Sequence, residues 1–140
     1  MKLYISIDIE GLPGIVSTTM VSPDRTQFKR GSDIMTRVVN EVVNALKDYD
    51  VSRIVVADSH GYMTNIDYLQ IPRGVTLIQG YPRPFSMVYG IDESFNAAMF
   101  IGYHAGAGTI HGFLDHTYSG RVIHEVIVNG VKASEYLINA

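Results

Sequence analysis

Cysteine is absent from this chain of 140 residues, and so is tryptophan. Without cysteine the protein has no disulfide bonds, no thiolate ligands for a metal and no cysteine nucleophile. A bound metal ion must therefore be held by nitrogen and oxygen atoms.

A surplus of positive charge is also absent, because 11 lysine and arginine residues are outnumbered by 14 aspartate and glutamate residues. The formal net charge is −3 and the isoelectric point is near 5.9. No stretch of the chain is basic enough to indicate a nucleic-acid-binding surface. We therefore expect no nucleic acid among the partners.

Long apolar runs are missing as well. None approaches the roughly 20 residues that a membrane-spanning helix needs, and the amino terminus enters a strand-like pattern without the apolar region of a signal peptide. Hydrophobic residues still make up 46% of the chain, which is enough for a packed core. The expectation is a soluble, cytoplasmic protein without membrane contact, folded as one metal-binding domain over residues 1–140.

Three strand-like segments end in side chains that bind metal ions. Residues 2–7, 53–57 and 98–102 lead into Asp8-Ile9-Glu10, Asp58-Ser59-His60 and Tyr103-His104. Aspartate, glutamate and histidine are ligands of divalent ions such as zinc. In an open parallel sheet, ligands bind beyond the carboxyl ends of the strands. We therefore predict a metal site at the carboxyl edge of one sheet.

Helical periodicity lies between the first two of these segments. From Ser32 to about Lys47, apolar residues follow rows of i, i+4 and i+8, which predicts one apolar helix face. The strand–helix–strand order predicts parallel strands, with a further strand at 75–79. The predicted fold class is α/β, with a mainly parallel sheet flanked by helices and the first strand at its centre.

The remaining segments have weaker patterns. We expect irregular structure or loops at 15–30 and 61–74, a short helix at 92–98, a strand at 121–128 and a tight turn at Asn129-Gly130. Residues 131–140 read as the beginning of a helix with Ser134 as its cap, and no stop signal follows. The chain is therefore expected to be one part of a longer ancestral protein.

Each candidate ligand also has a purely structural interpretation. Asp8 and Glu10 point to the same side of a strand end, where carboxylates are commonly solvated, but two close like charges are unfavourable without a cation between them. His60 alone is readily a turn histidine and His104 a buried one. Asp58 is either a partner of a ligand or, as we favour, a turn-forming residue. Taken together, the carboxylates and histidines favour a metal site.

Other candidates are weaker on position alone. A glutamate in a first helical turn, such as Glu135, ordinarily complements the helix dipole. His111 and His116 lie in a glycine-containing loop, where a solvated histidine is the ordinary interpretation. Ser6 allows a Ser/His/Asp triad to be written, but the chain has no Gly-x-Ser-x-Gly elbow, so we discount it.

The sequence resembles the zinc-dependent D-aminopeptidases of the dipeptide-transport operon type, peptidase family M55, over essentially all of its length. The matching stretches are Ile7-Asp8-Ile9-Glu10-Gly11, Arg30-Gly31 with Ile34-Met35-Thr36, Asp58-Ser59-His60, Arg83-Pro84-Phe85-Ser86-Met87-Val88 and Phe100-Ile101-Gly102-Tyr103-His104-Ala105. This resemblance implies that a pair of zinc ions is bound by Asp8, Glu10, His60, His104 and Glu135. It also implies that His116 acts in catalysis.

The chain departs from the family pattern in three ways. Asp115-His116 stands where the family has Ser-His, and the loop between His104 and His116 is longer than usual, with His111 as an extra candidate. Family members are also longer, so that this chain resembles their amino-terminal half.

The implied function is hydrolysis of short peptides with an amino-terminal D-residue by a two-zinc centre. Asp8 is expected to bridge the ions, and His116 to act as nucleophile or general base. Homo-oligomerisation, or a partner that supplies the missing half, is expected. The alternative is a catalytically silent metal-binding half-protein that acts as an assembly or ligand-binding module. Phosphoester hydrolysis is a weaker third hypothesis, because no P-loop is present.

Overall fold

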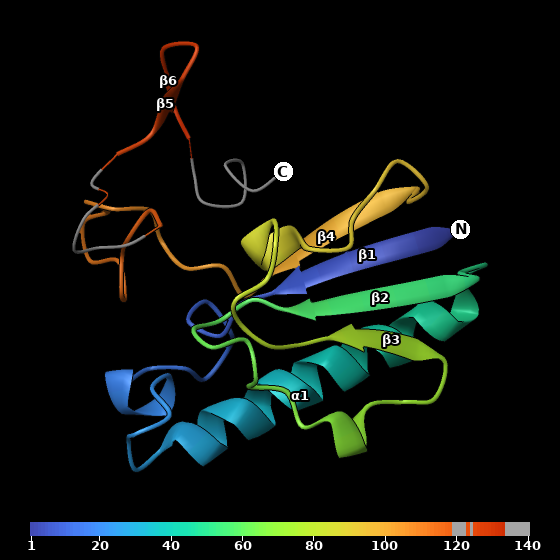
Figure 1. Ribbon diagram of the computed structural model, residues 1–140. Helices are drawn as coiled ribbons and strands as arrows, with labels where there is room; N and C mark the ends of the chain where they lie inside the picture. The colour runs from blue at the N-terminus through green and yellow to red at the C-terminus, as the bar shows by residue number, and fades with distance from the viewer. Residues whose placement is uncertain (119–122, 124, 134–140) are drawn as a thin grey trace.

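A sheet of four parallel strands forms the centre of the computed structural model (Figure 1), which describes residues 1–118, 123 and 125–133. The strand order is β3-β2-β1-β4, so β1 lies inside the sheet as predicted. The strands are β1 (Lys2–Ile7), β2 (Arg53–Asp58), β3 (Val75–Ile78) and β4 (Ala97–Ile101). The four strands predicted for this sheet are confirmed, with ends that differ by about one residue, as is usual for boundaries.

The register of the strands brings three chemically important ends to one edge. Ile7 lies opposite Asp58 on β2 and opposite Ile101 on β4. The residues that follow these positions therefore leave the sheet side by side, as the sequence predicts.

Helix α1 (Phe28–Ala45) covers one face of the sheet and continues into a 3-10 turn, η2 (Leu46–Asp48). It begins before the predicted Ser32, so the predicted loop at 15–30 is wrong for the first turn of α1. Gly31 lies in the first turn of α1, where a Cβ would overlap the carbonyl oxygen of Met20. The absence of a side chain lets the helix pass close to the preceding 3-10 helix, η1 (Thr18–Met20).

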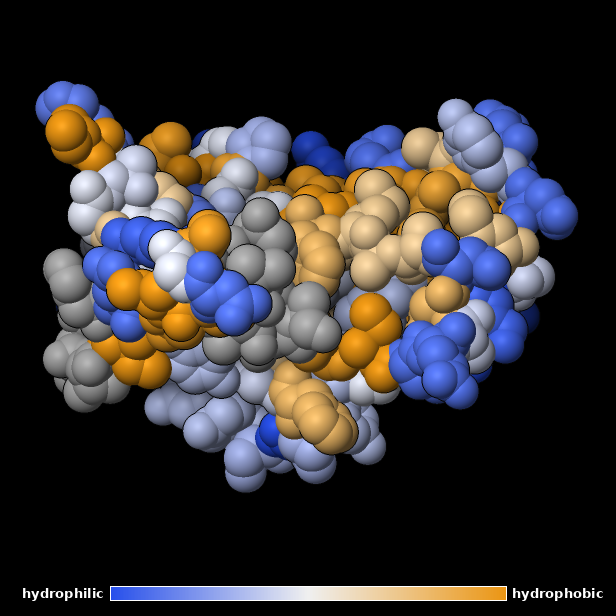
Figure 2. All heavy atoms as spheres, turned by 90° about the horizontal axis from the view of Figure 1, so that it is seen from above, coloured by the Kyte–Doolittle hydropathy of each residue, from blue (hydrophilic) through white to orange (hydrophobic). Residues whose placement is uncertain are grey.

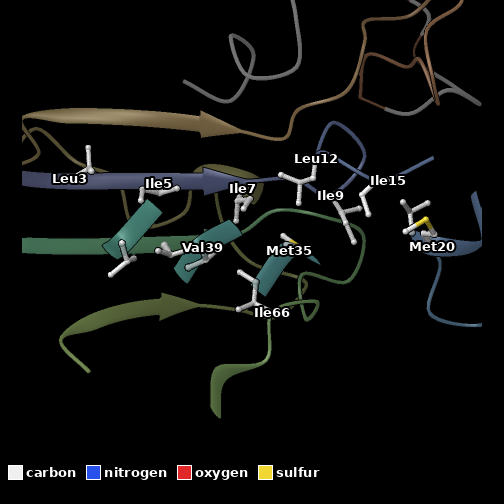
Figure 3. Close-up of a cluster of buried hydrophobic side chains, with 13 residues drawn as sticks. Leu3, Ile5, Ile7, Ile9, Leu12, Ile15, Met20, Met35, Val39 and Ile66 are labelled. Carbon is white, nitrogen blue, oxygen red and sulfur yellow. The ribbon is translucent and has the colours of Figure 1, made fainter. Parts of the chain in front are cut away.

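The alternation of β1 divides its side chains between two apolar clusters. Leu3, Ile5 and Ile7 face α1, where they join the cluster that contains Met35 and Val39 (Figure 3). Burial of each such side chain contributes about 1.5–3 kcal/mol, so this face supplies much of the stability.

On the opposite face, Tyr4 meets the ring of Phe95 edge-on, with ring centroids 5.5 Å apart. The segment that carries Phe95 is not the short helix predicted at 92–98. Asp92 forms a turn instead: its side chain accepts the N–H of Ser94, its carbonyl oxygen accepts the N–H of Phe95, and β4 then begins at Ala97. Short 3-10 helices also occur at η3 (Tyr68–Gln70) and η4 (Ser86–Val88).

A separate hairpin consists of β5 (Ile127–Val128) and β6 (Val131–Lys132). Its Asn129-Gly130 turn is confirmed, and both residues have positive φ, as a two-residue hairpin turn requires. The predicted strand at 121–128 holds as a strand only at β5, while residues 121, 122 and 124 lie outside the described part. The predicted helix at 131–140 is wrong at β6, and residues 134–140, with Ser134 and Glu135, lie outside the description. Within the described ranges, no helix has the length and apolar character to cross a membrane.

Candidate metal centre

Two carboxylates stand at the carboxyl end of β1. Asp8 is buried, with 2% of its surface exposed, and its N–H donates to the carbonyl oxygen of Ile101 at 2.8 Å. Its Oδ1 accepts the N–H of Ile9 at 2.8 Å, which fixes the direction of the carboxylate. Glu10 follows two residues later and is also largely buried. Two buried carboxylates this close require a cation or a proton.

Two glycines allow the ends of β1 and β4 to approach each other. Gly11 donates its N–H to the carbonyl oxygen of Gly102 at 2.7 Å, and a Cβ on Gly11 would overlap the carbonyl oxygen of Tyr103. Gly102 has φ +71°, and a Cβ there would overlap the carbonyl oxygen of Asp8. This close contact places His104 beside the carboxylates.

His60, after β2, points one ring nitrogen at both carboxylates. Its Nδ1 lies 2.9 Å from Glu10 Oε2 and 3.3 Å from Asp8 Oδ1. Its Nε2 lies 2.6 Å from the carbonyl oxygen of Val21, which can only accept, so Nε2 carries a proton. Ligand atoms of the three side chains all lie within 4.8 Å of one another. A backbone carbonyl that orients a histidine in this way is typical of metal sites.

The electrostatics of this cluster favour a cation between its members. Burial disfavours a charged His60, but hydrogen bonds to Asp8 and Glu10 outweigh it and raise the pKa of His60 to about 10. Burial raises the pKa of Asp8 to about 7. Burial also acts to raise the pKa of Glu10, but hydrogen bonds from His60 and Asp8 dominate and lower it to about 2. A proton on His60 Nδ1 thus occupies the position that suits a metal ion.

His104 approaches Asp8 from the side of β4. Its Nδ1 donates to the carbonyl oxygen of Ala105 at 2.9 Å, and its Nε2 lies 3.7 Å from Asp8 Oδ2. Asp8 therefore has His60 beside one oxygen and His104 beside the other.

His116 also lies at this site, although it comes from a loop. Its ring stacks on that of His104, with centroids 3.5 Å apart and planes inclined by 17°. The backbone N–H of His116 donates to the carbonyl oxygen of Ala105 at 3.1 Å. The ring Nδ1–H donates to the carbonyl oxygen of Leu114 at 2.6 Å. The ring is thus oriented by its own loop.

The other loop positions do not face the cluster. Asp115 accepts the N–H of Gly108 at 2.7 Å and so closes the loop. His111 is exposed and has a φ of 59°. Glu135 falls outside the described residues.

A cavity of about 300 Å³ joins these groups. Asp8, Glu10, His60, His104 and His116 all line it. The sequence reasoning missed the remaining lining residues, which are Ser59, Gly61, Met63, Tyr81, Ser86, Met87 and Tyr118. They come from loops and the short helix η4, which have no periodicity, and only the family-like stretches that contain Ser59, Ser86 and Met87 could have pointed to some of them.

Asp58 is not a ligand, and its turn-forming role is confirmed. Its carboxylate accepts the N–H of Asn65 and of Ile66, the side-chain amide of Asn65 at 2.7 Å and that of Gln79 at 3.2 Å. The backbone N–H of His60 also donates to Oδ1, at 3.5 Å. Five donors on one buried carboxylate thus hold the loop that begins with His60.

Ser6 does not form a catalytic triad. Its hydroxyl lies 2.7 Å from the hydroxyl oxygens of both Ser59 and Tyr103, and it donates to the carbonyl oxygen of Met87 at 2.9 Å. This buried network packs under the cavity wall and lacks a histidine among the described residues.

Comparison with known proteins gives consistent results. The family model for D-aminopeptidase matches residues 1–140. The D-aminopeptidase of Bacillus subtilis (strain 168) is 36% identical over 140 residues, which are all of this chain and 50% of that protein. The solved structure of the "Zn-dependent D-aminopeptidase DppA from Bacillus subtilis, a self-compartmentalizing protease" is 34% identical with a TM-score of 0.94, and the match covers 99% of this chain and 50% of that one. The chain thus spans about half the length of these relatives.

Proposed function

Because this chain belongs to the D-aminopeptidase family, we propose that it is the metal-binding half of a zinc-dependent aminopeptidase that hydrolyses short peptides with an amino-terminal D-residue. The observation that carries the proposal is the convergence of Asp8, Glu10 and His60 within 4.8 Å of one another, at the carboxyl edge of a parallel sheet. The cavity they line also contains His104 and His116.

The donor set fits zinc. Imidazole nitrogens and carboxylate oxygens are its usual ligands in the absence of thiolates. Asp8, Glu10, His60 and His104 would hold the metal, with Glu135 as a further ligand implied by the family resemblance. The two oxygens of Asp8 lie near different histidines, at 3.3 Å and 3.7 Å, which supports a bridging role between two ions. When bound, zinc polarises a substrate carbonyl and lowers the pKa of coordinated water.

His116 would act as a general base or as a nucleophile. Because Nδ1 donates to the carbonyl oxygen of Leu114, Nε2 is the basic nitrogen of a side chain that lines the cavity. A neutral imidazole held in one tautomer suits a general base near neutral pH. Its stacking on His104 keeps it beside the metal ligands.

A direct assay separates this proposal from the silent half-protein. The chain, loaded with zinc, is incubated with a short D-alanyl peptide and, as control, its L-alanyl counterpart. Release of D-alanine that is lost in His116→Ala supports the aminopeptidase. Zinc binding without turnover, alone or with a polypeptide covering the second half of a relative, favours a metal-binding module.

We also propose that the chain works in contact with another polypeptide, either further copies of itself or one that supplies the second half of the family's chain. Parallel sheets are normally covered on both faces, yet Ala97, Ala98 and Met99 of β4 are exposed. Figure 2, which looks onto the side of β4 and the hairpin, shows apolar residues across this side. The similar solved structure is itself a self-compartmentalizing protease. A cytoplasmic location stays a prediction.

A further inference from the structure

We propose that Arg83 is a positioning residue that holds the metal-binding cavity together from behind. The inference rests on the proposed function only in expecting zinc at the site. Arg83 is absent from the residues that line the cavity, so we assign it a supporting role and not a substrate contact. Its guanidinium instead joins three segments that supply the cavity walls.

The three contacts of Arg83 all go to backbone carbonyl oxygens. Nη2 donates to Asp58 at 2.7 Å, Nε donates to Ser86 at 2.7 Å, and Nη1 reaches Ile78 at 3.4 Å. These acceptors lie at the end of β2, in η4 and at the end of β3. One partly buried side chain thus bonds to two adjacent strand ends and to the loop that faces them.

The contact with Asp58 acts on His60. The carboxylate of Asp58 is already occupied by donors from Asn65, Ile66 and Gln79. The bond from Arg83 fixes the carbonyl of the same residue, so both ends of Asp58 are held. The chain reaches His60 only two residues later, and an ångström of movement there would take Nδ1 away from Glu10 and Asp8.

The contact with Ser86 acts on the opposite wall. Phe85 and Ser86 have φ values of 55° and 44°, a left-handed conformation that residues other than glycine rarely adopt. Such backbone persists only where surrounding bonds hold it. Ser86 and Met87 line the cavity, and Ser86 Oγ accepts the hydroxyl of Tyr118 at 3.0 Å. Arg83 therefore stabilises the wall formed by Ser86 and Met87, which lines the same cavity as the histidines.

A lysine at position 83 could not make the same three hydrogen bonds as Arg83. A guanidinium presents five N–H donors in a rigid plane, whereas an ammonium is a single point on a flexible stem. Carbonyls from three segments require donors spread across the plane. Arg83→Lys keeps the charge and loses the geometry, which makes it the informative variant.

The experiment compares Arg83→Lys and Arg83→Met with Arg73→Met in the full chain. Arg73 is exposed and precedes β3, at the end of the strand away from the cavity. Zinc dissociation constants are measured by chelator competition well below the melting temperature, and amide hydrogen exchange is followed at residues 59–63 and 86–88. Changing a residue that supports metal ligands weakens metal binding by about 10–100-fold. We expect at least a tenfold loss and faster exchange in both Arg83 variants, and neither in Arg73→Met.

Each outcome decides the inference. Arg83→Lys with the zinc affinity and exchange of the unchanged chain overturns it, and so does a lowered melting temperature without either effect. If Arg83→Met does not fold, Arg83→Lys carries the comparison alone. If the unchanged chain binds no zinc, the proposed function fails, and the exchange rates of the metal-free proteins then test Arg83 independently.

Discussion

At the scale of single residues, the site is built around one aspartate. Asp8 is buried, and its two oxygens face His60 and His104. The other ring nitrogen of each histidine carries a proton that it donates to a backbone carbonyl oxygen: His60 to Val21, and His104 to Ala105. The protein therefore determines which nitrogen of each ring is available to a metal.

Removing single histidines should separate ligand from catalyst. His60→Ala should lower zinc content, because it removes the imidazole nitrogen that lies beside both carboxylates, and it should abolish peptidase activity as a result. His116→Ala should keep zinc content nearly unchanged and lose the activity. Metal analysis and the D-alanyl peptide assay are run on the same preparations. Zinc loss in His116→Ala would make His116 a ligand and refute its catalytic role.

Zinc affinity should fall as the pH falls. The raised pKa values, about 10 for His60 and about 7 for Asp8, mean that protons occupy the metal-free site at neutral pH. Zinc must displace them, so affinity should weaken about tenfold per pH unit for each proton released. The dependence should extend above pH 7, toward the pKa of His60, rather than end near the ordinary histidine value. Chelator competition from pH 6 to 9 measures it, and a constant affinity would contradict it.

At the scale of elements, the site depends on how closely the ends of β1 and β4 approach. The bond from Gly11 to Gly102 continues the ladder beyond the strands. It brings the loop with His104 and His116 against the residues that follow β1. The candidate metal centre therefore depends on two strand ends in contact and is supported on the β2 side by Asp58.

Gly102→Ala should disrupt both stability and the site. Gly102 has φ +71°, and its Cβ would overlap the carbonyl oxygen of Asp8. Gly74→Ala is a matched control, because Gly74 has φ +92° with nothing within 4 Å of its Cβ. Both variants should lose roughly 1–3 kcal/mol from the left-handed backbone, and Gly102→Ala should lose more, together with zinc. Urea unfolding in EDTA and zinc titration measure these effects; equal losses in both would show that the close approach is unimportant.

At the scale of the whole molecule, the described residues leave one side of the sheet incompletely covered. Helix α1 packs on β1 and β2, but Met99 of β4 is 37% exposed. The hairpin adds Ile127, Val128 and Val131, which are 61%, 50% and 66% exposed. An apolar edge strand is a template for another chain. The proposed zinc binding and catalysis can therefore depend on a second polypeptide even though the candidate ligands described lie on this one.

Association should depend on β4. We expect the chain to self-associate or to bind a polypeptide that supplies the family's second half, with weak or no turnover when alone. Met99→Lys should reduce this association, because it places a charge on the apolar edge. Thr76→Lys is the control on β3, the other edge strand, where Thr76 is already exposed. Sedimentation velocity and the peptide assay are combined. A monomer with full turnover and two tightly bound zinc ions would contradict the expectation.

The sequence by itself determined the elements whose patterns are local. The alternation of β1, the i, i+4 rows of α1 and the Asn129-Gly130 turn depend on near neighbours in the chain, so they were predictable. The meeting of metal-binding residues at the strand ends could also be predicted, because parallel strands place their carboxyl ends at one edge of the sheet. The start of α1 was predicted at Ser32 and lies at Phe28, in a turn where Gly31 packs closely against Met20, a contact that apolar periodicity does not report.

Only the tertiary structure decided how the candidate ligands are oriented and what supports them. His60 takes its tautomer from Val21, which lies 39 residues away, and Arg83 reaches Asp58 across 25 residues. No periodicity links such pairs, because each bond exists only after α1 and the strands have packed. A short-range pattern can place a donor at a strand end, but the direction in which it points is set by groups brought there by the rest of the fold.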